Sequence, residues 1–180
     1  NLIKDVVPSR PNEIWVSDIT YVETEEGVCY LSLITDAYSH MIVGWAVGPT
    51  LETVYPLEAI RMALSTIDDE TAAMLIHHSD RGSQYCSQTY VQELKRYNIS
   101  ISMTQSGDPL ENAVAERANG ILKTEWLYKM TIPTREVCKQ ELERIILFYN
   151  TERPHMSIGM QTPSMAHTQT GEQKRCWRNP

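Results

Sequence analysis

The pattern of apolar and polar positions predicts three consecutive strands, followed by alternating helices and strands. The three strand-like runs are joined by short turns, as in an antiparallel meander, and occupy residues 13–23, 28–36 and 40–48. Residues 52–66 then change to helical spacing, and residues 73–79 form a nearly continuous apolar run that is typical of a strand buried on both faces. The remaining pattern predicts elements at 87–97 (helix), 100–103 (strand), about 108–129 (helix) and 135–151 (helix).

The last two predicted helices carry clear end signals. Asp108 is a good N-cap residue, Pro109 suits the first helical position, and Glu111 completes a spacing that resembles a capping box. Thr134 is expected to cap the final helix, and Pro154 is expected to stop it.

Gly120 lies inside the first of these two helices. Glycine in a helix interior costs about 1 kcal/mol relative to alanine. The residue therefore indicates either the close approach of a backbone or ligand, or simple tolerance of a weak helix former.

The order of elements defines a fold class. Three antiparallel strands lead into a parallel continuation, with helices that cover the sheet. This order is typical of an α/β fold of the ribonuclease-H-like type, with a mixed five-stranded sheet flanked by helices. We expect an extended lead-in at 1–12, the core domain at 13–153 and a C-terminal tail, mostly loop, at 154–180.

Composition excludes several classes of protein. The 180 residues fit one domain with a sizeable core, and 42% hydrophobic with 22% charged residues indicates an ordinary globular chain. No apolar run approaches the roughly 18–20 residues of a membrane span, and no secretory signal is evident. The first residue is Asn1 rather than Met, so we expect a fragment or a processed chain.

The cysteines and the net charge narrow the chemistry. The four cysteines include no Cys-x-x-Cys pair and no zinc-ligand spacing, which favours reduced, incidental thiols. The net charge of −7, taken alone, argues against nucleic-acid binding, whose usual signature is a basic face. A group of metal-binding carboxylates would account for part of that negative charge.

Three acidic residues occupy positions where a carboxylate is costly. Asp18 interrupts an apolar strand, Asp80 ends another strand, and Glu116 lies on a predicted helix. Separately, each has an ordinary explanation: an edge-strand residue facing solvent, a turn cap, or a salt-bridged helix face. Together they fit Mg²⁺ or Mn²⁺, which prefer oxygen ligands, and two such ions support in-line displacement at phosphorus. The set therefore predicts a metal site for phosphodiester chemistry.

The helix that carries Glu116 presents two further polar residues on the same face. Asn112 and Lys123 lie four positions before and seven positions after Glu116, so an amide, a carboxylate and an ammonium share one stripe. His77 and His78 beside Asp80 are better interpreted as packed strand residues than as metal ligands or a hydrolase triad, because neighbouring strand residues point to opposite faces.

Five segments together resemble the catalytic core of the DDE-type transposases and integrases, that is, insertion-sequence transposases and retroviral integrases. The segments are Trp15–Tyr21, His77–Tyr85, Glu111–Arg117, Leu122–Glu125 and Phe148–His155. The resemblance spans about residues 11–166. It departs from the family at Glu111, where aspartate is frequent, and at residues 118–120, where an aromatic residue is usual.

The resemblance implies roles for particular residues. Asp18, Asp80 and Glu116 match the acidic triad that is both catalytic and metal-binding, with Mg²⁺ or Mn²⁺ as cofactor and two ions expected when DNA is bound. Lys123 matches a basic residue that contacts DNA near the reacting end. Further DNA contacts are expected from Asn112, Arg117 and Arg153.

The resemblance also implies an activity and partners. We expect Mg²⁺-dependent cleavage at the ends of a mobile element and strand transfer into target DNA, by a homodimer or higher oligomer in the bacterial cytoplasm, with no membrane partner. Two alternatives stay open at this point. One is a nuclease of the same fold that cuts without joining, and the other is a non-catalytic transposase remnant that binds DNA or assists assembly.

Overall fold

The centre of the protein is a five-stranded mixed sheet with the strand order β3-β2-β1-β4-β5. The computed structural model describes residues 1–105, 112–174 and 176. The strands are β1 (Ile14–Thr24), β2 (Gly27–Asp36), β3 (Ile42–Gly48), β4 (Ile76–Ser79) and β5 (Ser100–Met103). The predicted five-stranded α/β fold is therefore confirmed, and each predicted strand is present within a few residues of its expected bounds.

Strand pairing explains why β1 becomes the centre of the site. β1 pairs along its whole length with β2 in antiparallel register, and β2 pairs with β3 in the same way, which confirms the meander. On its other side β1 pairs with the short β4 in parallel register, and this pairing ends at Ser17 and Ser79. β4 in turn pairs in parallel with β5. From Asp18 onwards, β1 therefore extends beyond the end of β4.

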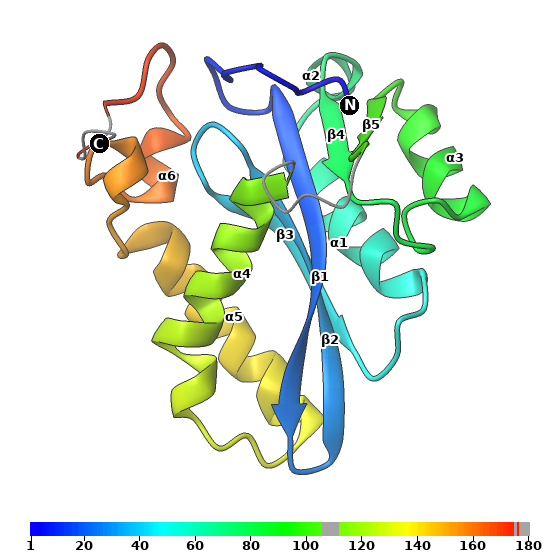
Figure 1. Cartoon of the computed structure of the whole chain (residues 1–180), viewed down its shortest axis with the longest axis vertical. Helices are drawn as coiled ribbons and strands as arrows, with labels where there is room; N and C mark the ends of the chain where they lie inside the picture. Colours follow the sequence, from blue (N-terminus) through cyan, green and yellow to red (C-terminus); the bar gives the residue numbers. More distant parts are fainter. Residues whose placement is uncertain (106–111, 175, 177–180) are drawn as a thin grey trace.

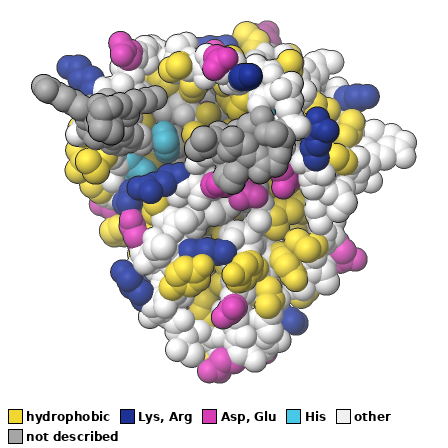
Figure 2. All heavy atoms as spheres, viewed as in Figure 1, with side chains coloured by type: hydrophobic (Ala, Val, Ile, Leu, Met, Phe, Trp, Pro, Cys, Tyr) yellow, Lys and Arg dark blue, Asp and Glu magenta, His cyan; other side chains and the backbone are white. Residues whose placement is uncertain are grey.

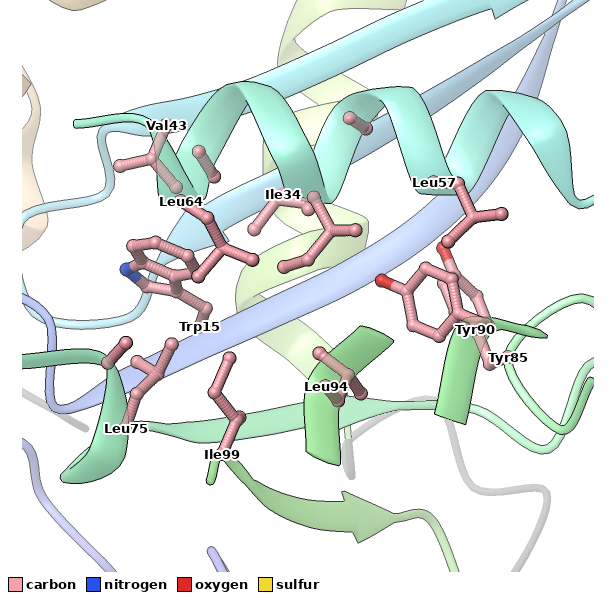
Figure 3. Close-up of a cluster of buried hydrophobic side chains, with 14 of the residues drawn as sticks. Trp15, Ile34, Val43, Leu57, Leu64, Leu75, Tyr85, Tyr90, Leu94 and Ile99 are labelled. Carbon is pink, nitrogen blue, oxygen red and sulfur yellow. The ribbon is translucent and has the colours of Figure 1, made fainter. Parts of the chain in front are cut away.

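Helices cover both faces of this sheet (Figure 1). The helices are α1 (Val54–Leu64), α2 (Asp69–Ala73), α3 (Gln88–Arg96), α4 (Ala113–Glu125), α5 (Arg135–Thr151) and α6 (Pro163–Ala166), with 3-10 turns η2 (Leu127–Lys129) and η3 (Met156–Ile158). α1 and α3 contribute to one buried cluster around Trp15 and Ile34, which Figure 3 shows in close-up. α4 and α5 contribute to a second cluster around Leu31 and Leu33.

Helix α5 follows its sequence signals closely. The side chain of Thr134 accepts a hydrogen bond from the backbone N–H of Val137 at 3.1 Å, so the predicted cap is formed. The apolar stripe that packs on the sheet is buried and consists of Leu142, Ile145, Ile146 and Tyr149.

Two features of the helices differ from the sequence-based expectations. α4 spans Ala113–Glu125 rather than continuing to about residue 129, and the expected cap residues Asp108, Pro109 and Glu111 lie outside the described residues. The short helix α2, capped by a hydrogen bond from the Thr71 N–H to Asp68, was not predicted because five residues are too few to show helical spacing.

The C-terminal tail is also more ordered than expected. It contains η3 and α6 rather than loop alone, and Ala166 is fully buried. His167 Nδ1 lies 2.8 Å from the hydroxyl of Ser39, and that hydroxyl donates to the buried carboxylate of Asp36. The contact of His167 with Ser39 therefore holds the C-terminal tail against the turn between β2 and β3.

Two glycines make a matched test of packing. A Cβ at Gly120 would meet nothing within 4 Å among the described residues, so no backbone among them approaches it closely; approach of a ligand and simple tolerance both stay open. Gly120→Ala should therefore raise the free energy of unfolding by roughly 0.5–1 kcal/mol. At Gly44 a Cβ would lie 2.2 Å from the carbonyl oxygen of Ala59, so Gly44→Ala should lower it by about 1–3 kcal/mol. Urea denaturation of both variants measures the two effects, and equal effects would contradict the packing.

Candidate active site

The parallel register of β1 and β4 brings two of the predicted carboxylates to the same level of the sheet. Ser17 is paired with Ser79, and Asp18 and Asp80 are the next residue in each strand direction. β1 has an antiparallel neighbour on one side and a parallel neighbour on the other. Ligand sites in open α/β sheets form beyond the carboxyl ends of parallel strands, where the topology changes. Asp18 and Asp80 occupy such a position.

Helix α4 is fastened to this part of β1 by two asparagines. The side-chain amide of Asn112 donates to the carbonyl oxygen of Ser17 at 3.0 Å. The amide of Asn119 donates to Oδ2 of Asp18 at 2.7 Å. Glu116 lies four residues after Asn112 and three before Asn119, so it belongs to the helical stripe that faces β1. Glu116 thus lies on the part of α4 that packs near Asp18.

Asp18 has the most perturbed environment of the three acids. Burial is the largest cause and raises the pKa of its carboxyl from 3.8 to about 6. The hydrogen bonds from Asn119 and from the Ile19 N–H oppose this rise, whereas the negative charges of Asp80 and Glu116 add to it. The two neighbours are therefore close enough to disfavour ionised Asp18, and a bound cation would reverse that effect.

The three carboxylates are positioned together by the backbone, but their oxygens have not converged. Asp80 is exposed, and its Oδ1 accepts a hydrogen bond from the Gly82 N–H at 2.8 Å. Glu116 is also exposed. Within the described residues, no three His, Cys, Asp or Glu side chains already form a metal-binding group. Figure 2 shows acidic side chains gathered near the centre of this face, with basic side chains on both sides.

The chemistry of this donor set fits a hard divalent cation. All three side chains offer carboxylate oxygens, and those of Asp80 and Glu116 are exposed to solvent. The buried Oδ1 atoms of Asn112 and Asn119 have no hydrogen-bond partner among the described residues. The side chains of this region therefore offer several oxygen atoms, and oxygen is the type of ligand atom that Mg²⁺ and Mn²⁺ prefer.

A buried hydrogen-bond network lies beneath the carboxylates. Nε2 of His77 is 2.7 Å from the hydroxyl of Ser17 and 2.9 Å from the hydroxyl of Tyr90, which joins β1, β4 and α3. Burial lowers the pKa of His77 to about 3, with a smaller effect of His78 in the same direction, so the ring is neutral. Figure 3 shows Tyr85 and Tyr90 together at one end of the buried cluster.

This network confirms that His77 is a packed strand residue. The hydrogen bond between His77 and Ser17 was not predicted from the sequence. Ser17, which directly follows the apolar residues 14–16, could have indicated it. A polar residue inside an apolar strand needs a buried partner. Because Ser17 and His77 lie at or near the ends of the paired segments, the network fixes the strands from which Asp18 and Asp80 project.

The four predicted DNA contacts have different surroundings. Lys123 is half-buried, with its ammonium 3.9 Å from the ring centroid of Tyr21, and Arg117 is exposed. Arg153 forms a two-bond ion pair with Glu125, at 2.7 and 2.5 Å. Asn112 is buried against β1. Lys123 and Arg117 are thus accessible for a ligand, whereas Arg153 and Asn112 already have intramolecular partners.

Comparison with known sequences establishes the family. A family model described as the integrase core domain matches residues 8–109, and a second model with the same description matches residues 97–163. The chain therefore belongs to the integrase core domain family, and the sequence-based resemblance is confirmed.

Several curated relatives are bacterial transposases. The chain is 34% identical to the transposase for insertion sequence element IS629 from Shigella sonnei, over 91% of this chain and 54% of the relative. It is 39% identical to a putative transposase for IS986/IS6110 from Mycobacterium tuberculosis, over 87% of this chain and 58% of the relative. The chain thus spans little more than half the length of these relatives.

Solved structures show the same fold at low sequence identity. One is the HTLV-2 integrase catalytic core domain in complex with magnesium, in its dimeric form, with a TM-score of 0.67, 18% identity, and coverage of 91% of this chain and 100% of that one. Another is the simian T-cell lymphotropic virus intasome in complex with PP2A regulatory subunit B56 gamma, with a TM-score of 0.75, 18% identity, and coverage of 97% and 61%. These likenesses confirm the ribonuclease-H-like fold. No helix in the described part of the chain is long and apolar enough to cross a membrane.

Proposed function

We propose that this chain is the catalytic core of a transposase that cuts DNA at the ends of a mobile element and joins the new 3′ ends to target DNA. The observation that carries the proposal is the register that pairs Ser17 with Ser79, the residues directly before Asp18 and Asp80, together with the hydrogen bonds that hold Asn112 and Asn119, on either side of Glu116, against β1. The bacterial transposases among the relatives support DNA as the substrate and the bacterial cytoplasm as the place of action.

Asp18, Asp80 and Glu116 are the residues that would hold Mg²⁺ or Mn²⁺. When bound, such ions favour attack by an oxygen nucleophile at phosphorus and stabilise the departing oxygen. Asn119 holds one oxygen of Asp18 and so fixes the direction of the other. Lys123, on the same helix face, would hold a DNA phosphate close to the carboxylates.

Partners follow from the proposed reaction. Joining two element ends in one event requires two active sites, so we expect two or more copies of the chain to act together on DNA. One structural neighbour, the HTLV-2 integrase catalytic core domain, is a dimeric form, which supports this expectation for the shared fold.

The test is a DNA assay that scores cut and joined products separately. The purified chain is incubated with DNA that carries the element's terminal sequences and a supercoiled target plasmid, with Mg²⁺, with Mn²⁺ or with EDTA. We expect cut and joined products with either metal ion and none with EDTA. Cut products without joined ones would favour the nuclease alternative, and neither product with intact DNA binding would favour the non-catalytic remnant.

A further inference from the structure

Tyr21 is an exposed aromatic residue three positions after Asp18 on the part of β1 that extends beyond β4. Half of its surface is accessible to solvent, at 50% exposure, although it lies within a central strand of the sheet. Buried packing therefore does not explain the aromatic ring at this position. Tyr21 therefore presents an exposed ring on the part of β1 that has no β4 neighbour.

The ammonium of Lys123 lies over the ring of Tyr21, with Nζ 3.9 Å from the ring centroid. This distance is well within the range of a cation–π interaction. Among the described residues, Lys123 forms no ion pair within 4.0 Å of a carboxylate. The aromatic ring is thus the close partner that fixes the position of the ammonium, and the positive charge stays available to an external anion.

The electrostatic surroundings of Lys123 include the carboxylate of Asp18. Burial lowers the pKa of Lys123, and the negative charges of Asp18 and Glu23 oppose that effect. The lysine is therefore close enough to interact with Asp18 as well as with Tyr21.

A second tyrosine widens the aromatic surface. Tyr30 on β2 is directly paired with Tyr21 in the antiparallel register, and it is partly exposed. Directly opposed residues of neighbouring strands have side chains on the same face of the sheet.

We propose that Tyr21 is a stacking surface for an unpaired nucleobase at the reacting strand end, with Lys123 bound to the phosphate of the same nucleotide. A nucleotide is the ligand that fits because it carries a flat aromatic ring beside an anion, which complements an exposed ring beside a cation. Stacking on an aromatic residue is tolerant of sequence, since every base has a π-face. The proposal rests on DNA as the substrate, and it assigns a residue and a DNA conformation to that function.

The consequence for the reaction is a frayed DNA end. A base held on Tyr21 cannot remain in the duplex stack, so binding at this position would separate the last base pairs. Separation frees the strand near the scissile phosphate to reach Asp18 and Asp80. Tyr21 is then a positioning residue rather than a catalytic one, because it orients the DNA strand and the side chain of Lys123.

The experiment measures the binding of a DNA duplex with a two-nucleotide unpaired 3′ overhang, whose last nucleotide carries either adenine or no base. Metal-free buffer separates binding from cleavage. In the unaltered chain, we expect loss of the base to weaken binding by about tenfold. In Tyr21→Leu this penalty should disappear, and in Tyr21→Phe it should persist. Tyr128→Leu is the matched control, since Tyr128 is 67% exposed and lies on η2.

The outcomes separate this inference from the proposed function. If Tyr21→Leu keeps the full penalty for the missing base, stacking on Tyr21 is wrong, whatever the cleavage assay shows. A uniform loss of binding to both DNAs in Tyr21→Leu would also overturn it, because a purely structural role predicts no selectivity for the base. A third outcome is that the unaltered chain shows the penalty for the missing base but no metal-dependent cleavage. That result would contradict the proposed function and leave the stacking on Tyr21 standing.

Discussion

Asp80→Asn and Glu116→Gln should each lower the rate of DNA cleavage and joining by about a thousandfold or more. Each change removes the negative charge of one proposed metal ligand while it keeps the shape of the side chain. Both residues are exposed, so the fold should be retained. Single-turnover cleavage of labelled DNA in Mg²⁺ and in Mn²⁺ measures the loss directly.

Glu143→Gln supplies the control for this prediction. Glu143 is an exposed carboxylate on α5, the helix adjacent to α4, and it has no proposed role in the site. Its change should leave the rate within about twofold of the unaltered chain. Full activity of Glu116→Gln, with a fold verified by circular dichroism, would remove Glu116 from the site.

Asp18→Asn should stabilise the metal-free protein at neutral pH while it abolishes activity. The pKa of Asp18 is raised from 3.8 to about 6 in the folded state, so the ionised carboxylate opposes folding. Ionisation of Asp18 lowers the free energy of unfolding. This loss is absent below pH 4, grows as the pH rises from about 4 to 6, and reaches up to about 3 kcal/mol above pH 6.

Urea denaturation at pH 4 and pH 7.5 checks the sign of this effect. The two proteins should be similarly stable at pH 4, and Asp18→Asn should be the more stable one at pH 7.5. Added Mn²⁺ should reverse the order, because only the unaltered chain gains stability from binding the ion. A lower stability of Asp18→Asn at pH 7.5 without metal would show that its carboxylate supports the fold rather than opposing it.

Much of the fold could be predicted because its elements have strong local signals. The strand-like runs of β1 and β2 with a short turn between them, the continuous apolar run of β4 and the capped stripe of α5 each specify one element type. Helix α2 and the helices of the tail are too short to generate a period. The contact of the tail with Ser39 depends on burial, which local sequence does not encode.

The candidate site was predictable as a set of residues but not as a set of contacts. Asp18, Asp80 and Glu116 were expected to meet; the register pairs Ser17 with Ser79, the residues directly before Asp18 and Asp80, and a shared metal site stays a prediction. The hydrogen bond from Asn119 to Asp18 and the cation–π contact of Lys123 with Tyr21 were not expected, because both join residues about a hundred positions apart. Such pairs arise only from the docking of α4 on β1.

The ion pair of Arg153 with Glu125 shows a further limit of sequence reasoning. A conspicuous arginine in the segment Phe148–His155 was expected to contact DNA, but its guanidinium is engaged in joining the end of α5 to the end of α4. The DNA contact of Arg153 stays a prediction, and the structure gives the residue an additional structural role.

The central claim is that Asp18, Asp80 and Glu116 form one divalent-metal site, and anomalous diffraction from crystals soaked in Mn²⁺ tests it most directly. We expect an anomalous peak within about 2.0–2.4 Å of carboxylate oxygens of Asp18 and Asp80, with the Glu116 side chain turned towards it. Mn²⁺ bound elsewhere on the protein, with these three carboxylates free of metal, would contradict the account.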